Sequence, residues 1–317
     1  MPVIYAKAPG KIILFGEHAV VYGQPAIAIP VIKVSAIARV IPNPDGRPGE
    51  VRVQAPDILL DSALSDLAED DPIAIAARLS FEAAGVKHIP AFTLHISSTI
   101  PMAAGMGSSA AISTAIIRAL SDFFGLPLSA DQVSAFAYQV EIIQHGTPSG
   151  IDNNVIAHQK PVFFIRDQPI EHLEIEQPTH WVIADSGEKT PTRETVSDVR
   201  NLFDTDPQNY GQIFNKIGEI TRNARESLIK GDLTQLGALI DENQRLLEQI
   251  NVSSPILERL IIAAKNAGAV GAKLSGGGRG GNIIALSSPD KVEDIAAALL
   301  NAGAIRIITT SLNKVRR

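Results

Sequence analysis

The chain has 317 residues, of which 45% are hydrophobic and 20% are charged, and its formal net charge is −6. This usage is ordinary for a globular protein and excludes disordered and fibrous classes. The sequence contains no cysteine, which excludes disulfides, thiolate metal sites, iron–sulfur clusters and cysteine nucleophiles. The acidic balance argues against nucleic acid as the main partner. At about 150 residues per domain, the length predicts two domains or one large one.

Neither the opening residues nor the most hydrophobic stretch indicates a membrane or secretory segment. The opening lacks a charged lead followed by a long apolar core, so we expect no signal peptide. The stretch from Ile96 to Ile117 carries no charged residue and is about long enough to span a bilayer. Serines, threonines, glycines and a proline interrupt it too often for a membrane span. We therefore expect a soluble, cytoplasmic protein with no membrane partner.

In the first half of the chain, strands are predicted to come before helices. Short apolar runs bounded by glycine or proline, or rich in β-branched residues, predict strands at 12–15, 26–29, 33–40, 51–53 and 92–96. Helices are predicted at 72–85, 110–124, 129–144 and 151–158 from apolar spacing and end signals. Ser129 and Gln132 have the spacing of a capping box, which marks the start of one of these helices.

The second half is predicted to be helix-rich, with strands mainly near its end. After a strand at 163–165, the polar run 166–179 is the best domain boundary, which predicts domains at 1–170 and 171–317. Helices are predicted at 193–203, 207–230, 233–250, 255–266 and 292–300, and strands at 269–274, 282–286 and 305–309. The fold class is α+β in two lobes.

The first of three glycine-rich segments, residues 7–23, gathers a lysine, a glutamate and a histidine around a short apolar strand. These residues are Lys11, Glu17 and His18. Taken singly, each is as typical of a solvated strand end as of a site. Together, between closely spaced glycines, they are more typical of a site.

The second glycine-rich segment, residues 101–111, leads directly into a predicted helix. Glycines let backbone N–H groups converge, and a helix start adds partial positive charge, so the segment predicts an anion cradle. Ser108 and Ser109 could cap the helix, contact phosphate or bind Mg²⁺. The spacing matches neither a Walker A loop nor a Rossmann fingerprint.

The third glycine-rich segment, residues 273–282, places five glycines between two apolar strands, more than a hairpin tip requires. Between the second and third segments lie Glu141 and the turn Thr147-Pro148-Ser149-Gly150-Ile151-Asp152-Asn153. One carboxylate there can orient or deprotonate a hydroxyl, and another can hold a divalent metal. Alone, Asp152 is more often a helix cap than a base.

Taken in order, these segments resemble the three motifs of the GHMP kinase superfamily, in the family's order and spacing across nearly the whole chain. The opening, Pro9-Gly10-Lys11 with Gly16-Glu17-His18-Ala19-Val20-Val21-Tyr22-Gly23, is similar to the mevalonate kinase branch. The turn at 147–153 matches that branch as well. A galactokinase would be expected to carry Gly-Glu-His-x-Asp-Tyr, and a homoserine kinase would lack the Gly-Glu-His element.

The resemblance implies a two-lobed GHMP kinase fold, with an N-terminal mixed α/β nucleotide-binding lobe and a C-terminal helix-rich α+β lobe. It implies that ATP and substrate bind in the cleft between the lobes. The implied reaction moves the γ-phosphoryl group of ATP to the primary hydroxyl of mevalonate and gives 5-phosphomevalonate. This is the first kinase step of the mevalonate pathway to isoprenoids.

The resemblance also implies a role for individual residues. Asp152 would face the substrate hydroxyl as base or orienter, and Lys11 would neutralise charge beside it. Mg²⁺ would be held by Glu141 with Ser108 or Ser109, and the choice of serine stays open. The ATP phosphates would be wrapped by the loop comprising Pro101, Ala104, Gly105, Met106, Gly107, Ser108, Ser109 and Ala110. The substrate would be contacted by Lys11, Glu17, His18, Asp152 and Thr192, with the third motif at Ser275, Gly276, Gly277 and Gly278.

Mevalonate carries a carboxylate, which a fork-shaped guanidinium suits. Arg193, beside Thr192, is our candidate for that contact. The third motif departs from the family pattern, because Gly277 replaces an alanine and Arg279 replaces a glycine. Arg279 either points outward or contributes positive charge near the cleft.

Two classes of alternative function stay open, which are another enzyme of the same superfamily and a non-catalytic relative. A phosphomevalonate kinase would need extra cationic side chains for a second phosphate, and no such cluster lies beside Asp152 in the sequence. A decarboxylase of the same pathway would be expected to diverge from the Gly-Glu-His-Ala segment found here. A non-catalytic, ligand-sensing relative would be expected to have lost Lys11, Glu141 or Asp152, and all three are present. A homodimer is common in the family, and the sequence leaves it open.

Overall fold

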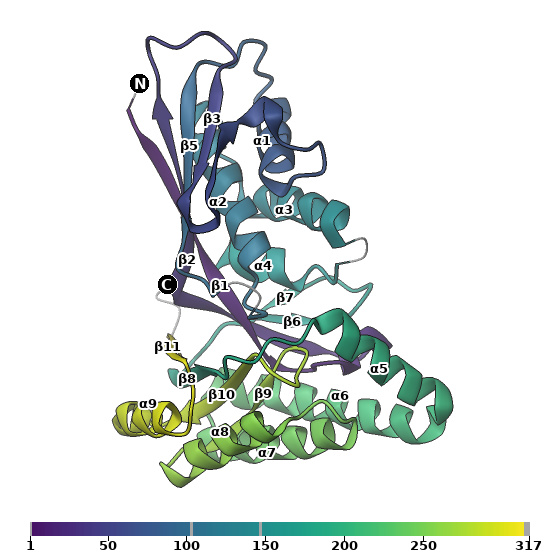
Figure 1. Ribbon diagram of the computed structural model, residues 1–317. Coiled ribbons are helices and arrows are strands. Elements are labelled where there is room, and N and C mark those ends of the chain that lie inside the picture. The colour runs from purple at the N-terminus through teal and green to yellow at the C-terminus, as the bar shows by residue number, and fades with distance from the viewer. Residues whose placement is uncertain (1, 102–103, 146–147, 314–317) are drawn as a thin grey trace. The chain divides into compact units, whose positions relative to one another are not determined.

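The computed structural model describes residues 2–101, 104–145 and 148–313 (Figure 1). The described chain forms two compact units. The first unit comprises Met1–Lys11, Pro30–Pro101 and Met106–Gln159, and the second comprises Ile12–Ile29, Met102–Gly105 and Lys160–Arg317. Strands β1 (Ile4–Phe15) and β2 (Ala26–Pro42) contribute residues to both units. The domain division after residue 170 stays a prediction.

Strand β2 is one continuous strand where the sequence predicts two. Pro30 is the reason for the difference, since a proline in an apolar run normally demotes a strand prediction. In the structure, Ala26–Ala28 pair antiparallel with β6 (Val162–Phe164), and Ala36–Pro42 pair antiparallel with β5 (Phe92–Ser98). Pro30 lies outside both ladders, so its missing N–H breaks neither of them.

The first unit packs four helices against a sheet. In the sheet, β3 (Val51–Ala55) pairs antiparallel with β4 (Leu60–Ala63) and parallel with β5, and β5 pairs with β2. The helices are α1 (Pro72–Ala83), α2 (Ser108–Phe123), α3 (Ala130–His145) and α4 (Ile151–His158). Alternate residues of β5 are buried, and α2 packs against that strand (Figure 1). This alternation is the period-2 pattern of a half-buried strand.

The second unit is built on an antiparallel sheet with the strand order β11-β8-β10-β9. These strands are β8 (Thr179–Asp185), β9 (Gly271–Ser275), β10 (Asn282–Ser287) and β11 (Arg306–Leu312). Its helices are α5 (Thr192–Thr205), α6 (Pro207–Lys230), α7 (Leu233–Gln249), α8 (Pro255–Asn266) and α9 (Val292–Asn301). Every residue of β9 and β10 is buried, and α7, α8 and α9 pack against this sheet.

Local signals place most of these elements correctly. The predicted capping box is confirmed: Ser129 N donates to Gln132 Oε1 at 3.0 Å, and Gln132 N donates to Ser129 Oγ at 3.2 Å. Three strands were not predicted. The short strands β4 and β7 (Glu171–His172) carry many polar residues, and the sequence analysis missed β8 although its apolar run Trp181–Ala184 follows a proline-containing loop. Four 3₁₀ turns complete the described chain, at Ala19–Tyr22, Pro56–Ile58, Leu64–Asp66 and Pro289–Lys291.

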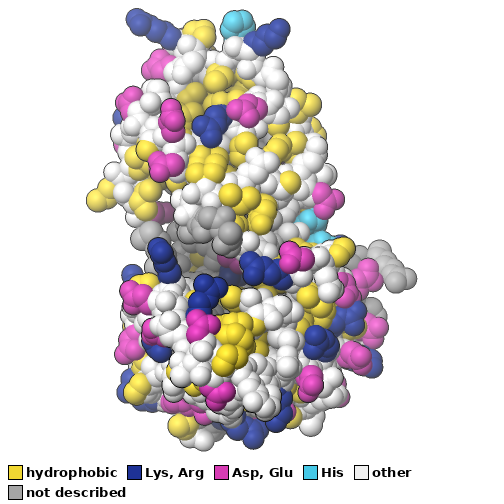
Figure 2. All heavy atoms as spheres, turned by 90° about the vertical axis from the view of Figure 1, so that its right-hand side faces the viewer, with side chains coloured by type: hydrophobic (Ala, Val, Ile, Leu, Met, Phe, Trp, Pro, Cys, Tyr) yellow, Lys and Arg dark blue, Asp and Glu magenta, His cyan; other side chains and the backbone are white. Residues whose placement is uncertain are grey.

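Acidic and basic side chains are mixed over the lower part of the face in Figure 2, where they form no patch of one sign. The second unit also contains the ion pairs Lys265–Asp241 and Lys291–Asp294. Within the described ranges, no helix combines the length and the apolar character that crossing a membrane requires.

Candidate active site

Lys11 and Asp152 form an ion pair in the first unit. The lysine Nζ lies 3.0 Å from Oδ1 of Asp152, and the two side chains are 7% and 31% exposed. Lys11 belongs to β1, whereas Asp152 stands in the first turn of α4. The fold therefore joins a proton acceptor to a positive charge, and the acceptor is open to solvent on one side.

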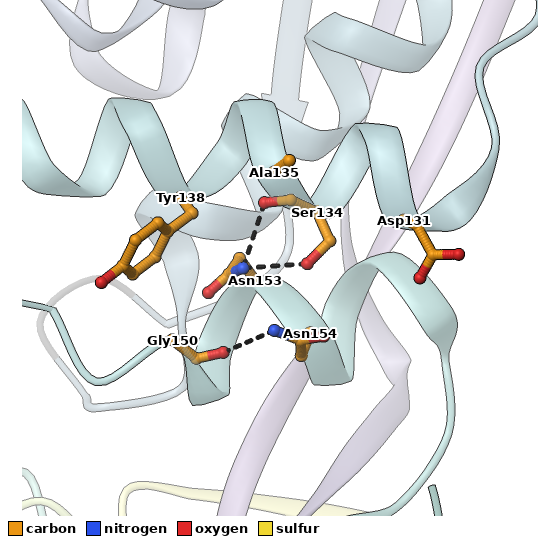
Figure 3. A pocket seen from close by; sticks show the side chains of 7 residues that line it. All are labelled: Asp131, Ser134, Ala135, Tyr138, Gly150, Asn153 and Asn154. Carbon is orange, nitrogen blue, oxygen red and sulfur yellow. Dashed lines mark hydrogen bonds between the residues drawn. The ribbon is translucent and has the colours of Figure 1, made fainter. Parts of the chain in front are cut away.

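Helix α4, which carries Asp152, is fastened to α3 by the next residue along the chain (Figure 3). Asn153 is 3% exposed, and its Nδ2 donates to the Ser134 carbonyl at 3.0 Å and to Ser134 Oγ at 2.9 Å. The helix starts after Gly150, whose φ of 83° favours glycine. Its carbonyl accepts a hydrogen bond from Asn154 Nδ2 at 2.9 Å.

A cavity of about 290 Å³ opens between these two helices. It is lined by Asp131, Ser134, Ala135, Tyr138, Gly150, Asn153 and Asn154. Asn153 Nδ2 is bound to Ser134 of α3, and Asn154 Nδ2 is bound to the Gly150 carbonyl at the start of α4 (Figure 3). The Asn153 contact therefore holds the first turn of α4, which carries Asp152, against α3.

The predicted anion cradle has the backbone that close approach requires. Gly105 and Gly107 both have a φ of 69°, in the left-handed region, and Gly107 directly precedes α2. No side chain among the described residues caps this helix start, which leaves its N–H groups directed outward. A Cβ on Gly107 would lie 2.9 Å from Lys11 Cγ. Met106 O accepts a hydrogen bond from Lys11 N at 3.0 Å, so the loop lies directly on β1.

Ser109 and Glu141 supply a hydroxyl–carboxylate pair next to the loop. Ser109 Oγ lies 2.7 Å from Oε1 of Glu141 and 2.7 Å from Oε1 of Gln144. The described residues contain no cluster of three His, Asp or Glu side chains able to hold a metal by themselves. Mg²⁺ does not need one, because it commonly takes one or two carboxylates together with substrate phosphates. The oxygens present fit that ion.

In the second unit, Glu17 forms a buried ion pair with Lys273. The side chains are 1% and 0% exposed, and Lys273 Nζ also donates to the Leu274 carbonyl at 2.7 Å. Burial raises the pKa of Glu17 and lowers the pKa of Lys273, while their mutual attraction opposes both shifts. The motif spacing does not single out Lys273. Its one sequence signal is a lysine inside the apolar strand β9.

His18 binds the third glycine-rich segment. Its Nε2 donates to the Gly277 carbonyl at 2.9 Å, and the residue has a left-handed φ of 59°. Burial lowers the pKa of His18, the Gly277 carbonyl opposes this, and the charges of Arg279 and Lys273 lower it further. Ser275 Oγ donates to the Ile13 carbonyl at 2.7 Å. The later part of the first motif is therefore joined to the third motif.

The side chain of Arg279 is bound by other residues of the second unit. Its guanidinium forms an ion pair with Asp198 of α5, and its Nε donates to the Asn251 carbonyl at 3.0 Å. Its φ is 57°, which suits the glycine that the family usually has there. Asp198 and Asn251 thus hold the side chain and compensate its charge.

Thr192 and Arg193 open helix α5, and both are exposed. A Cβ on Gly277 would lie 3.2 Å from Thr192 Cγ2, so the glycine in place of the family's alanine gives this threonine room. Of the loop residues, Pro101 and Ala110 are buried, and the Ala104 carbonyl accepts a hydrogen bond from Asn282 Nδ2. Thr147, which opens the aspartate turn, lies outside the described residues.

Comparison with known proteins decides the family. The model of the GHMP kinases N terminal domain matches residues 71–159, and that of the GHMP kinases C terminal domain matches residues 224–305. The chain belongs to the GHMP kinase family. The expected GHMP kinase fold is therefore confirmed. As a GHMP kinase, the protein is a phosphotransferase with an alcohol as acceptor, and it uses ATP.

The chain's relatives within the GHMP kinases include mevalonate kinases. It is 34% identical to the mevalonate kinase of Thermococcus sibiricus, over 96% of this chain and 95% of that protein. It is 33% identical to the mevalonate kinase of Pyrococcus furiosus over the same shares. The crystal structure of L. major mevalonate kinase in complex with R-mevalonate matches with a TM-score of 0.83 and 29% identity. That match covers 99% of this chain and 97% of that one.

Proposed function

We propose that the protein transfers the γ-phosphoryl group of ATP to the primary hydroxyl of mevalonate, which yields 5-phosphomevalonate and ADP. This is the first kinase step of the mevalonate pathway. The observation that carries the proposal is the 3.0 Å pairing of Lys11 with Asp152 in a chain whose relatives are mevalonate kinases.

Asp152 serves as the base that faces the substrate hydroxyl. As the hydroxyl oxygen bonds to the γ-phosphorus, its proton passes to the Asp152 carboxylate. The bond from the γ-phosphorus to the β,γ-bridging oxygen breaks, and ADP leaves with that electron pair. Lys11, whose Nζ lies beside Asp152, offsets the negative charge that gathers on the transferred group.

The glycine loop binds the ATP phosphates through its backbone. Gly105 and Gly107 allow the phosphates to approach the main chain, and the uncapped N–H groups at the start of α2 face them. The Lys11 side chain occupies the space that a Cβ on Gly107 would need, which supports a γ-phosphate position near that lysine.

Glu141 and Ser109 would hold Mg²⁺. The 2.7 Å contact between their oxygens favours Ser109 over Ser108 as the ligand. The ion, when bound, neutralises charge on the ATP phosphates. Gln144 Oε1, also 2.7 Å from Ser109 Oγ, helps to orient the serine hydroxyl.

The second unit supplies mevalonate contacts through His18, Thr192 and Arg193. Glu17 supports these contacts indirectly, since its carboxylate is bound by Lys273 and it positions His18 next to it in the chain. Arg193, exposed at the start of α5, binds the mevalonate carboxylate. Arg193→Ala should raise the KM for mevalonate and leave the KM for ATP unchanged. Arg200→Ala, on the same helix, is the matched control, and an unaltered mevalonate KM in Arg193→Ala would refute the assignment.

The function is tested by an ATP-dependent phosphorylation assay that offers mevalonate, phosphomevalonate, galactose and homoserine side by side. Mevalonate should be the preferred acceptor. Preference for phosphomevalonate would favour the alternative kinase. Absence of turnover with all four, despite measurable binding of mevalonate, would favour a non-catalytic relative.

A cytoplasmic location and a homodimer are proposed on the family resemblance alone. Light scattering after size-exclusion chromatography measures the oligomeric state, and a monomer mass would reject the homodimer. Fractionation of the source cells tests the location.

A further inference from the structure

Arg118 of α2 contacts both elements that carry the Lys11–Asp152 pair. Its Nη2 donates to the carbonyl of Ala157, in the last turn of α4, and its Nη1 donates to the carbonyl of Lys7 in β1 at 3.5 Å. Ala157 lies five residues after Asp152, and Lys7 lies four residues before Lys11. One guanidinium therefore joins the strand of the lysine to the helix of the aspartate.

The contact to β1 lies on the same strand edge as the contact of the glycine loop. Backbone groups of a strand point to alternate edges, so residues four apart share an edge. The Lys7 carbonyl accepts from Arg118, and Lys11 N donates to the Met106 carbonyl at 3.0 Å on that edge. Met106 lies just before α2, so this helix and its leading loop hold β1 at two points.

The contact to α4 satisfies a helix end. The last carbonyls of a helix have no partner within the helix and carry partial negative charge, so a cation there is favourable. Asn153 fastens the first turn of α4 to α3, while Arg118 fastens its last turn to α2. Helix α4 has only eight residues and gains little stability of its own. Its position therefore depends on tertiary contacts, which are the packing of its buried Ile151, Val155 and Ile156 and the hydrogen bonds of Asn153 and Arg118.

We propose that Arg118 is a positioning residue for the reaction: it sets the separation of Lys11 and Asp152 by holding β1 and α4 to α2. The inference rests on the proposed function for its kinetic effect. The guanidinium is half-buried, and the acidic side chain that acts on it is that of Asp122 on its own helix. The planar fork of arginine is required, because a lysine amine cannot reach two carbonyls in fixed directions.

The test compares Arg118→Met, Arg118→Lys and the control Arg52→Met in the full chain, with mevalonate and ATP as substrates. Arg52 forms an exposed ion pair with Asp61 in the same unit and touches none of the site residues named above. Arg118→Met should lower kcat about 10- to 100-fold, the scale of a 1 Å misplacement, with little change in the KM for ATP. Arg118→Lys should regain only part of kcat, and Arg52→Met should match the unaltered protein.

Two further measurements separate positioning from general stability. Millimolar guanidinium should raise the kcat of Arg118→Ala and leave that of Arg52→Ala unchanged. In a Lys11→Met background, the effect of Arg118→Met on kcat should shrink, because the pair that it positions is already broken. Equal effects in both backgrounds, or an unchanged kcat in Arg118→Met, would overturn the inference. If Arg118→Met does not fold, the same comparisons made with Arg118→Lys decide whether the inference holds.

The distance itself gives a readout that does not depend on the substrate. A crystal structure of Arg118→Met, or of Arg118→Lys, should show Lys11 Nζ and Asp152 Oδ1 farther apart than 3.0 Å. An unchanged separation would overturn the inference even in an active kinase. A lengthened separation in a protein that does not phosphorylate mevalonate would instead count against the proposed function.

Discussion

Lys11 Nζ lies 3.0 Å from Oδ1 of Asp152, and the backbone N–H of the same lysine donates to the Met106 carbonyl at 3.0 Å. A single strand residue thus contacts the aspartate through its side chain and the glycine loop through its main chain. The base and the predicted phosphate cradle are therefore held by one residue of β1. We therefore expect some substitutions in the first unit to change kcat and others to change the binding of ATP or Mg²⁺.

Asp152→Asn removes the proton acceptor and keeps the size of the side chain. We expect kcat to fall by about three orders of magnitude or more, with a smaller effect on ATP affinity, because general-base contributions are about 10²–10⁴-fold. Steady-state kinetics with mevalonate and nucleotide-binding titrations measure the two effects. Turnover close to that of the unaltered enzyme would remove Asp152 from the mechanism.

Ser109→Ala and Ser108→Ala distinguish the two serines at the start of α2. Ser109→Ala should raise the Mg²⁺ concentration needed for half-maximal activity more than Ser108→Ala, because only Ser109 has the 2.7 Å contact with Glu141 described above. Titration of Mg²⁺ at saturating ATP checks this. A larger shift in Ser108→Ala would reverse the assignment.

The burial of His18 predicts that the free energy of unfolding changes with pH. Its folded-state pKa lies below the ordinary value of 6.5, mainly because it is buried. As the pH falls through 6.5, the unfolded chain takes up a proton that the folded chain resists, so this contribution to the free energy of unfolding decreases. The slope is at most about 1.4 kcal/mol per pH unit.

Replacing His18 by glutamine should therefore make the loss of stability between about pH 7 and pH 5 shallower. Urea unfolding at several pH values measures it. Parallel pH profiles for the two proteins would contradict the burial of a neutral His18.

Arg279→Gly and Arg279→Ala form a matched pair, since both lose the ion pair with Asp198 and the bond to Asn251. Glycine also relieves the left-handed φ of 57°, and alanine does not. The glycine variant should be more stable than the alanine variant by about 1 kcal/mol. Denaturant unfolding of the two variants tests this, and an alanine variant of equal or greater stability would show that the backbone is unstrained there.

Local features of the sequence were enough to predict most elements and the family. The reciprocal hydrogen bonds of Ser129 and Gln132 follow from a spacing of three residues, which any chain folded as a helix there would bring together. The left-handed Gly105 and Gly107 are likewise encoded locally, because only glycine adopts that backbone without strain. The motifs that the sequence shares with the GHMP kinases are chain-order patterns of the same kind.

Contacts between distant residues were decided by the tertiary structure. Spacing does not reveal that Glu17 meets Lys273, that His18 meets the Gly277 carbonyl, or that Arg118 joins β1 to α4. Such contacts depend on how strands pair and helices pack, and a residue's type restricts its distant partners only weakly. Pro30 makes the same point for the backbone, since β2 runs through it and the ladders with β5 and β6 do not use its missing N–H. The sequence by itself determined which residues have the required chemistry, and the packing of β1, α2 and α4 decided which of them meet.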